Sequence, residues 1–523
     1  MSGLAAKLHR TARWHSERIA AIDGEREASF GTIESRSNRL ANGLLGLSED
    51  VGGQAGPRGG RVALLLPNSL EYIEADLAIV KAGKAKVPIN VRLTPDERAY
   101  VMRDSGAELL ITDEAGLASI AEGHREQLPD LHNVLVVGPD ACGQTGYEAL
   151  LQKASDAPPG LPEDPDAPSV ILYTSGTTGR PKGAASSFRS RWLTTVNMLV
   201  SELDVAPGDG MIHAGSMAHG SGSKALAFFL SGARNIAMRK FDGEAFFDLV
   251  ERHGATHTFL VPTMIATLLE ASRSRSAPSP ALKTLSYGGA PIAEPLLREA
   301  LAELGGALVQ VYGSCEAPHP ITILSKADHA ELIEGRAASI GRESLAVETL
   351  IADADGQPVA DGEPGELLVG GPSVMSGYWN ASEATARAFV DGHYRTGDVA
   401  RRDEHGYLYI VDRQREMIIT GGLNVYPAEV ERVLCEHDAV AEVAVIGVPD
   451  ERWGESVMAV VVASPNAPVG EEDLLEHCRA RLAGYKKPRH VSFVERLPKG
   501  STGKVLKREL RQEFWEGRSR MVN

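Results

Sequence analysis

The 523-residue sequence has only four cysteines and few aromatic residues, and it has no long apolar run. Its cysteines, Cys142, Cys315, Cys435 and Cys478, are far apart and form no C-x-x-C pair. This spacing argues against a disulfide framework or a zinc site and favours a reducing, cytoplasmic location. No stretch of about 18 apolar residues is available to span a membrane. The first 20 residues also lack the apolar core of a secretion signal.

Positive charge is scarce as well. The chain has 54 Lys and Arg against 70 Asp and Glu, a net charge of -16, which argues against general binding to nucleic acid. The exception is segment 481–523, where twelve basic and four acidic residues give a local balance of +8. This segment is either a solvated basic helix or a face for a small polyanion such as a nucleotide.

The remaining composition is that of a globular protein too long for one hydrophobic core, with 43% hydrophobic and 24% charged residues. Near the N-terminus an apolar strand (61–67), an amphipathic helix (69–83) and a second strand (86–90) follow one another. Thr94, Pro95 and Glu97 then form a helix-capping signature. Strands alternating with helices predict an α/β fold with layered, mainly parallel sheets.

The pattern changes after about residue 340. Short apolar stretches separated by Asp-Gly and His-Gly turns predict antiparallel hairpins, and hence a β-rich subdomain. A smaller α/β unit follows, with a helix beginning at Pro427 and a strand over 440–448. We therefore predict a large N-terminal domain over 1–413 and a small, mobile C-terminal domain over 414–523.

One loop has the composition of a phosphate-binding site. The stretch "YTSGTTGRPKGA" (173–184) follows an apolar strand and contains glycines, hydroxyls and Lys182. Glycines let several backbone N–H groups point into one concavity, and the hydroxyls and lysine add donors and charge. The stretch does not fit the G-x-x-x-x-G-K-[ST] pattern, so taken alone it is either a phosphate loop or a surface turn.

Four further motifs accompany this loop in a recognisable order. They are "YGSCEAP" (312–318), "YRTGD" (394–398), "DRQREMIITGGLNVYPAEVE" (412–431) and "PKGSTGK" (498–504). Together the five stretches resemble the motifs of the adenylate-forming superfamily, in its acyl-CoA synthetase branch. The resemblance extends over nearly the whole chain. It implies that a carboxylic acid reacts with ATP to give an acyl adenylate and pyrophosphate, with Mg²⁺ as the metal. The thiol of CoA then takes the acyl group and AMP leaves.

The resemblance also assigns catalytic and metal-binding roles. Lys504 would bridge the substrate carboxylate and the α-phosphate, where negative charge develops. Glu316 would act in catalysis by holding Mg²⁺, with Thr177 as a second ligand. His219 would gate the passage between the acyl pocket and the thiol tunnel. Cys315 departs from the family, which usually has Thr there, and a thiol is the weaker hydrogen-bonding group.

The resemblance further implies the nucleotide contacts. Asp398 would accept hydrogen bonds from the ribose hydroxyls with Arg413 assisting, and Tyr312 would stack on the adenine ring. For CoA, two adjacent glycines would let the pantetheine arm pass, and an aromatic ring and a lysine would meet its nucleotide end. The complete expected set is Thr174, Ser175, Gly176, Thr177, Thr178, Gly179, Lys182, Gly288, Gly289, Ala290, Tyr312, Gly313, Asp398, Arg413, Gly421, Gly422, Trp453 and Lys487.

Two alternatives stay open: a stand-alone ligase that loads a carrier-protein thiol, and a non-catalytic nucleotide or acyl sensor. The presence of Lys504 argues against the sensor, because binding alone does not need that lysine. The expected partners are a carboxylic acid, ATP and CoA, with a homodimer as an open alternative. Small residues after His219 favour an aryl, alicyclic or medium aliphatic acid. Lys224 is a candidate cation for a second substrate carboxylate.

Overall fold

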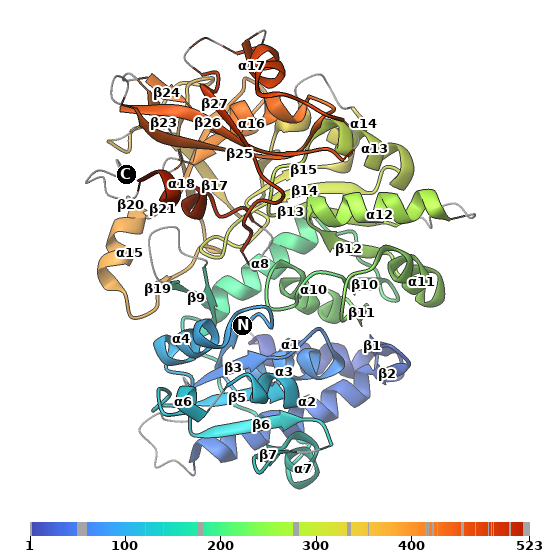
Figure 1. Ribbon diagram of the computed structural model, residues 1–523. Helices are drawn as coiled ribbons and strands as arrows, with labels where there is room; N and C mark the ends of the chain where they lie inside the picture. The colour runs from blue at the N-terminus through green and yellow to red at the C-terminus, as the bar shows by residue number, and fades with distance from the viewer. Residues whose placement is uncertain are drawn as a thin grey trace. The chain divides into compact units, whose positions relative to one another are not determined.

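The structure is a computed structural model of the whole chain, shown in Figure 1. It describes residues 3–49, 60–120, 122–139, 141–174, 181–275, 282–331, 336–353, 355–413, 416, 418–420, 423–425, 427–450, 454–465, 467–479, 481–482, 484, 486–500 and 504–515. The chain divides into two compact units. The first contains residues 1–337, 341–348 and 370–394, and the second contains 338–340, 349–369 and 395–523.

The first unit contains a nine-stranded sheet in the order β16-β15-β14-β13-β12-β10-β11-β1-β2. Strands β14 to β1 along this order pair in parallel, and the antiparallel pairs lie at the two edges. The strands are β1 (Ile19–Asp23), β2 (Arg26–Ser29), β10 (Gly210–His213), β11 (Arg234–Ala237), β12 (His257–Leu260), β13 (Thr284–Gly288), β14 (Leu308–Tyr312), β15 (Thr322–Leu324) and β16 (Arg342–Glu343).

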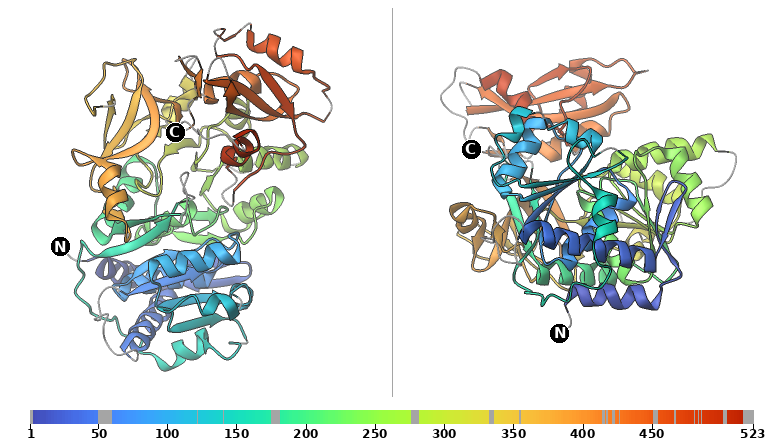
Figure 2. Two further views of the ribbon diagram at one scale, coloured as in Figure 1. Left: turned by 60° about the vertical axis from the view of Figure 1, so that its left-hand side comes forward. Right: turned by 90° about the horizontal axis from the view of Figure 1, so that it is seen from below.

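The same unit contains an eight-stranded sheet in the order β19-β9-β8-β4-β3-β5-β6-β7, which belongs to the blue and cyan part of Figure 2. Here β8 to β7 pair in parallel, and β9 and β19 add an antiparallel edge. The strands are β3 (Arg61–Leu65), β4 (Ala85–Pro88), β5 (Leu109–Asp113), β6 (Asn133–Val137), β7 (Thr145–Gly146), β8 (Pro168–Tyr173), β9 (Gly183–Ser187) and β19 (Gly377–Tyr378).

Helices cover both sheets, and α11, α12 and α13 pack side by side along the nine-stranded sheet (Figure 1). The helices of this unit are α1 (Leu4–Trp14), α2 (Phe30–Glu49), α3 (Leu70–Lys81), α4 (Pro95–Ser105), α5 (Glu114–Ala118), α6 (Glu122–Arg125), α7 (Tyr147–Lys153), α8 (Phe188–Ser201), α9 (Gly220–Ser223), α10 (Ala225–Leu230), α11 (Gly243–His253), α12 (Pro262–Ser274), α13 (Glu294–Leu304), α14 (Lys326–Ala330), η1 (Arg336–Ala338, a 3₁₀ turn that runs one residue past this unit) and α15 (Ser382–Ala388).

Helix α3 is not amphipathic, so that part of the sequence prediction is wrong. Every residue of α3 is buried, because helices α1 and α2 cover it in addition to strands β3 and β4 of one sheet and β1 of the other. Its charged side chains are therefore paired: Asp76 Oδ1 lies 2.8 Å from Lys86 Nζ and 2.7 Å from Arg191 Nη2. Buried charges persist only with such partners.

The second unit contains two smaller sheets. In one, β17 (Glu348–Ala352), β18 (Gly365–Gly370), β21 (His393–Arg402) and β22 (Leu408–Arg413) are neighbours in that order. Strand β20 (Phe389–Val390) pairs with the first residues of β21, and that pairing lies within the first unit. In the other the order is β24-β23-β26-β25, with β27 beside β26. These elements are β23 (Ile418–Thr420), β24 (Leu423–Val425), β25 (Val440–Asp450), β26 (Gly454–Ala463), β27 (His490–Phe493), α16 (Pro427–Cys435), α17 (Glu471–Arg479) and α18 (Lys507–Trp515).

The predicted α/β class is confirmed, and so are the capping box at Thr94, the helix from Pro427 and the strand beginning at 440. The hairpin turn ending at Gly406 is also present, with Asp403 N–H bonded to Tyr407 O at 2.9 Å. No helix within the described ranges has the length and apolar character that crossing a membrane requires. The domain boundary at 413/414 stays a prediction.

Candidate functional site

The predicted phosphate loop joins two neighbouring antiparallel strands. Strands β8 and β9 pair, and Thr174 N–H donates to Lys182 O at 3.0 Å, which closes the base of the loop. A second contact fixes the returning chain, because Tyr100 Oη donates to Pro181 O at 2.9 Å. Thr174 and Lys182 are thus the anchored ends of the loop. The predicted ligands between them, Ser175, Gly176, Thr177, Thr178 and Gly179, lie outside the described residues.

The predicted adenine site lies at the carboxyl ends of β13 and β14. These strands are parallel neighbours with Gly288 opposite Val311, so "GGAP" and Tyr312 emerge side by side. Ligands of parallel α/β sheets bind at this edge. A Cβ atom on Gly288 would lie 2.2 Å from Val311 O, so only glycine fits there. Gly313 is similarly restricted, because its Cβ would lie 2.5 Å from His319 N.

Glu316 is connected to the phosphate loop through Tyr378, a residue that our sequence analysis did not identify. The Tyr378 hydroxyl donates to Glu316 Oε1 at 2.9 Å. The ring of Tyr378 also lies beneath Lys182, with Nζ 5.0 Å from the ring centroid. The side chain of Glu316 is buried, and Met375 N–H donates to the Glu316 carbonyl at 2.7 Å. Tyr378 lies in the stretch "SGYW" (376–379). We did not single out this stretch from the sequence because it contains no charged side chain.

A single carboxylate of this kind is a suitable ligand for Mg²⁺. The described residues contain no cluster of three or more His, Cys, Asp or Glu side chains that would hold a metal ion. Mg²⁺ does not need such a cluster, because it binds proteins through one or two carboxylates together with substrate phosphates and water. Glu316 therefore fits the ion, which when bound with ATP offsets the charge of the phosphates.

The predicted gate, His219, is held by a side chain from the strand β4 region. Its Nε2 lies 3.1 Å from Asn90 Nδ2, and burial lowers the pKa of His219. Gly220 follows it at the start of α9, beside two stacked rings. The centroids of the Phe259 and His319 rings are 5.3 Å apart and the ring planes are nearly parallel, at 3° to each other. A Cβ on Gly220 would lie 3.1 Å from Phe259.

Lys224 is not available for a second substrate carboxylate, which corrects our sequence-based suggestion. Its ammonium group forms an ion pair with Glu202, and both side chains are 0% exposed. Ser286 Oγ donates to the same carboxylate at 2.5 Å. Burial raises the pKa of Glu202, but the charge of Lys224 outweighs this effect and holds the pKa below its ordinary value. The two charges therefore neutralise each other in the interior of the first unit.

In the second unit, Asp398 lies in β21 opposite Arg413 of β22. Asp398 is buried, and its N–H donates to Thr396 Oγ1 at 3.1 Å. Glu366 of β18 holds the preceding turn, accepting from Arg395 Nε at 2.9 Å and from Gly397 N–H at 3.2 Å. The structure thus brings the two predicted ribose-binding positions together, and Glu366 is a supporting residue that the motifs did not indicate.

Lys504 is exposed, and the backbone on both sides of it is held by specific contacts. Gly500 N–H donates to Lys504 O at 2.8 Å, and the start of α18 is tied down by Lys507. Lys507 Nζ lies 3.0 Å from Glu416 Oε2 and 2.7 Å from Glu431 Oε1. The backbone around the predicted catalytic lysine is therefore held by the segment that follows β22.

The predicted CoA contacts are only partly described. Gly421, Gly422 and Trp453 lie outside the described residues, and Lys487 is half-buried. Several cations of the basic segment 481–523 already have acidic partners. Lys486 Nζ, for example, lies 2.8 Å from Glu429 Oε2. Part of the local charge of +8 is thus neutralised within the unit.

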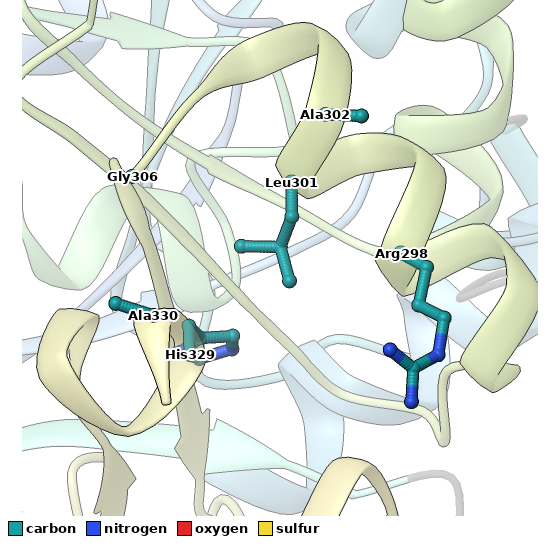
Figure 3. A pocket seen from close by; sticks show the side chains of 6 residues that line it. All are labelled: Arg298, Leu301, Ala302, Gly306, His329 and Ala330. Carbon is teal, nitrogen blue, oxygen red and sulfur yellow. The ribbon is translucent and has the colours of Figure 1, made fainter. Parts of the chain in front are cut away.

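The first unit also has a cavity of about 430 Å³ between α13 and α14 (Figure 3). Its polar side chains are already engaged: Arg298 Nε donates to Glu294 at 2.8 Å, and His329 Nε2 lies 2.9 Å from Tyr287 Oη. No predicted site residue lines it, and we assign it no ligand.

The chain is similar to known proteins over nearly its whole length. Residues 8–379 match the family model of AMP-binding enzymes, and residues 429–504 match the model of the AMP-binding enzyme C-terminal domain. A feruloyl-CoA synthase of Amycolatopsis sp is 39% identical over 518 residues, which are 98% of this chain and 99% of that protein. A medium/long-chain-fatty-acid–CoA ligase of Mycobacterium tuberculosis is 36% identical over 85% of this chain and 80% of that protein.

The solved structure of o-succinylbenzoate CoA synthetase from Bacillus subtilis, in complex with its acyl-adenylate intermediate, has the same fold. It superposes with a TM-score of 0.83 at 31% identity and covers 96% of this chain and 97% of that one. The motif order, the fold and these full-length similarities agree. The chain belongs to the AMP-binding enzyme family, in the acyl-CoA synthetase branch of the adenylate-forming superfamily, and is an ATP-dependent carboxylate–CoA ligase.

Proposed function

We propose that the phosphate loop, Glu316 and Lys504 carry out the first half-reaction. The observation that carries this proposal is the contact of one side chain, Tyr378, with both Lys182 and Glu316. Through this contact the cation Lys182, at the end of the phosphate loop, and the carboxylate of Glu316, which suits Mg²⁺, are both held by Tyr378. The loop, with Thr177 as a further Mg²⁺ ligand, then holds the departing β- and γ-phosphates.

The substrate carboxylate attacks the α-phosphate while negative charge shifts onto the phosphate oxygens. A positioned cation stabilises that charge more in the transition state than in the ground state. Lys504 has this role in our proposal, and its segment is anchored through Lys507. Asp398, with Arg413 across the ladder, binds the ribose, and Tyr312 faces the adenine with "GGAP" opposite.

In the second half-reaction the small C-terminal domain, beginning at 414, presents a different face. We assign Gly421 and Gly422 to the passage of the pantetheine arm, and Trp453 and Lys487 to the nucleotide end of CoA. His219 separates the acyl pocket from this passage. Its low pKa keeps the imidazole neutral at pH 7, which suits a gate beside an uncharged acyl group.

The acid is an aromatic carboxylic acid without a second charge. The stacked Phe259 and His319 rings lie beside Gly220, and flat rings prefer such neighbours. The Lys224–Glu202 pair supports the same choice, because a neutralised lysine cannot compensate a second carboxylate. The activity of the related feruloyl-CoA synthase agrees with an aromatic substrate.

A pyrophosphate-release screen tests the proposal. Cinnamic, benzoic, medium-chain aliphatic and dicarboxylic acids are each supplied with MgATP, with and without CoA, and thioester is measured separately. We expect the highest kcat/KM for an aromatic monocarboxylic acid, with CoA-dependent thioester. A preference for dicarboxylic acids contradicts the pocket assignment. Pyrophosphate release without thioester, restored by a carrier protein, favours the alternative acceptor.

We also propose a cytoplasmic location, because the four cysteines of the sequence are few and widely spaced and form no C-x-x-C pair. A homodimer is the alternative to a monomer, and sedimentation equilibrium distinguishes the two.

A further inference from the structure

Tyr378 belongs to a short segment whose backbone is fixed on both sides. Strand β19 pairs with β9, and Ser376 N–H donates to Ala185 O at 2.8 Å while Trp379 N–H donates to Gly183 O at 2.7 Å. The Tyr378 N–H itself donates to Thr385 Oγ1 of α15 at 2.9 Å. The ring therefore has little freedom to follow either of the groups that it contacts.

The same segment holds Glu316 at two points. Met375 N–H donates to the Glu316 carbonyl, and the Tyr378 hydroxyl donates to Oε1. A carboxylate held at its backbone and at one oxygen cannot rotate freely about its terminal bond. Lys182 lies over the face of the same ring, where the π electrons attract a cation.

We propose that Tyr378 is a positioning residue for the adenylation step, and that it sets two groups independently. Its hydroxyl orients Glu316 for Mg²⁺, and its ring holds Lys182 at the end of the phosphate loop. This inference rests on the proposed function, in which Glu316 is the metal ligand. It adds a residue to which the sequence motifs gave no role.

The two roles can be separated by substitution. Tyr378→Phe removes the hydroxyl and keeps the ring, whereas Tyr378→Leu removes both. Tyr147→Phe is a matched control, because the Tyr147 hydroxyl donates to the buried carboxylate of Glu74 at 2.8 Å, in a part of the core that contains no proposed site residue. It reproduces the loss of a phenol-to-carboxylate hydrogen bond without touching Glu316. Glu316→Gln tests the assignment on which the inference depends.

The measurement is the affinity for ATP by isothermal titration calorimetry, in saturating Mg²⁺ and in EDTA. The ratio of the two dissociation constants reports the coupling between metal and nucleotide. We expect Tyr378→Phe to reduce this coupling about tenfold, since hydrogen bonds to charged groups are worth that much or more. The affinity of Tyr378→Phe for ATP in EDTA should stay within about twofold of the wild-type value, because the ring that contacts Lys182 remains. Tyr378→Leu should additionally weaken binding in EDTA about threefold, the size of an exposed cation–π contact.

The outcomes distinguish the inference from its premise. Loss of coupling in Glu316→Gln and Tyr378→Phe, with Tyr147→Phe at the wild-type value, supports both. Loss of coupling in Glu316→Gln alone overturns the role of Tyr378 and leaves the proposed function standing. Unchanged coupling in Glu316→Gln overturns the metal assignment and the inference together. Equal weakening of ATP binding by Tyr378→Phe with and without Mg²⁺ indicates a merely structural role and also overturns it.

Discussion

The buried ion pair between Lys224 and Glu202 provides a sharp test of the electrostatic reasoning. The perturbation is Lys224→Met, which keeps much of the side-chain volume and removes the charge. Both partners are 0% exposed, and the Glu202 carboxylate would keep only the hydrogen bond from Ser286 Oγ at 2.5 Å. Its other oxygen, Oε2, is buried without a hydrogen-bond partner in the described part of the chain. The variant thus leaves a buried, uncompensated anion.

The expected cost follows from this geometry. Removing one partner of a buried pair destabilises a protein by about 3–5 kcal/mol, because the remaining charge stays desolvated. Replacing both partners with neutral residues, as in Lys224→Met with Glu202→Gln, should return the stability to within about 1 kcal/mol of the wild type. The recovery in the double variant separates the electrostatic cost from a simple loss of packing.

The pH dependence gives an independent check. In the wild type the pKa of Glu202 lies below its ordinary value of 4.5, so this carboxylate stabilises the fold above pH 4.5 and less as the pH falls. In Lys224→Met the strongest opposing charge is gone, and we expect burial to outweigh the weaker effects of His319 and the Ser286 hydrogen bond and to raise the pKa of Glu202 above its unfolded value. The pH dependence of the Glu202 contribution is then reversed. In the variant this contribution to stability is greatest in acid and falls as the pH rises. The difference in unfolding free energy between the variant and the wild type should be largest at pH 7 and become smaller toward pH 4.5.

Hydrogen exchange read by mass spectrometry measures this without assuming that the whole chain unfolds in one step. The informative peptides come from α8 and α10, which lie on either side of the pair in sequence. At pH 7, protection in these peptides should fall by about 3–5 kcal/mol in the single variant and recover in the double variant. A single variant within about 1 kcal/mol of the wild type, or a gap that does not change with pH, refutes the reasoning.

Three further predictions concern the reaction and the nucleotide site. Lys504→Ala should lower the rate of adenylation about 100-fold or more, while thioester formation from prepared acyl adenylate persists; equal loss of both half-reactions would exclude its assigned role. Lys507→Met should lower kcat for adenylation about tenfold, because the contact with Glu416 that anchors this segment is lost, and unchanged kinetics in both half-reactions would contradict it. Gly288→Ala places a Cβ 2.2 Å from Val311 O, so we expect about 1–3 kcal/mol of destabilisation in urea and weaker ATP binding by calorimetry; wild-type affinity would show that this edge is not the adenine site.

Local signals predicted much of the fold. The capping box at Thr94 and the helix beginning at Pro427 depend on neighbouring residues, so they could be read from the sequence. Motif order was equally informative for the reaction, since Glu316, Asp398 and Lys504 each lie in a short, distinctive stretch. The sequence alone thus determined the fold class, the chemistry and the residues proposed to perform it.

Only the tertiary structure decided what surrounds those residues. Helix α3 was predicted to be amphipathic, yet all of its residues are buried, because helices α1 and α2 pack against it as well as strands of the two sheets. Lys224 looked like a free cation, and it is neutralised by Glu202, which precedes it by 22 positions. Tyr378 contacts Glu316 across 62 positions and Lys182 across a still longer separation. Such pairings have no local signature, because the chain distance between partners carries no information about their distance in the folded protein.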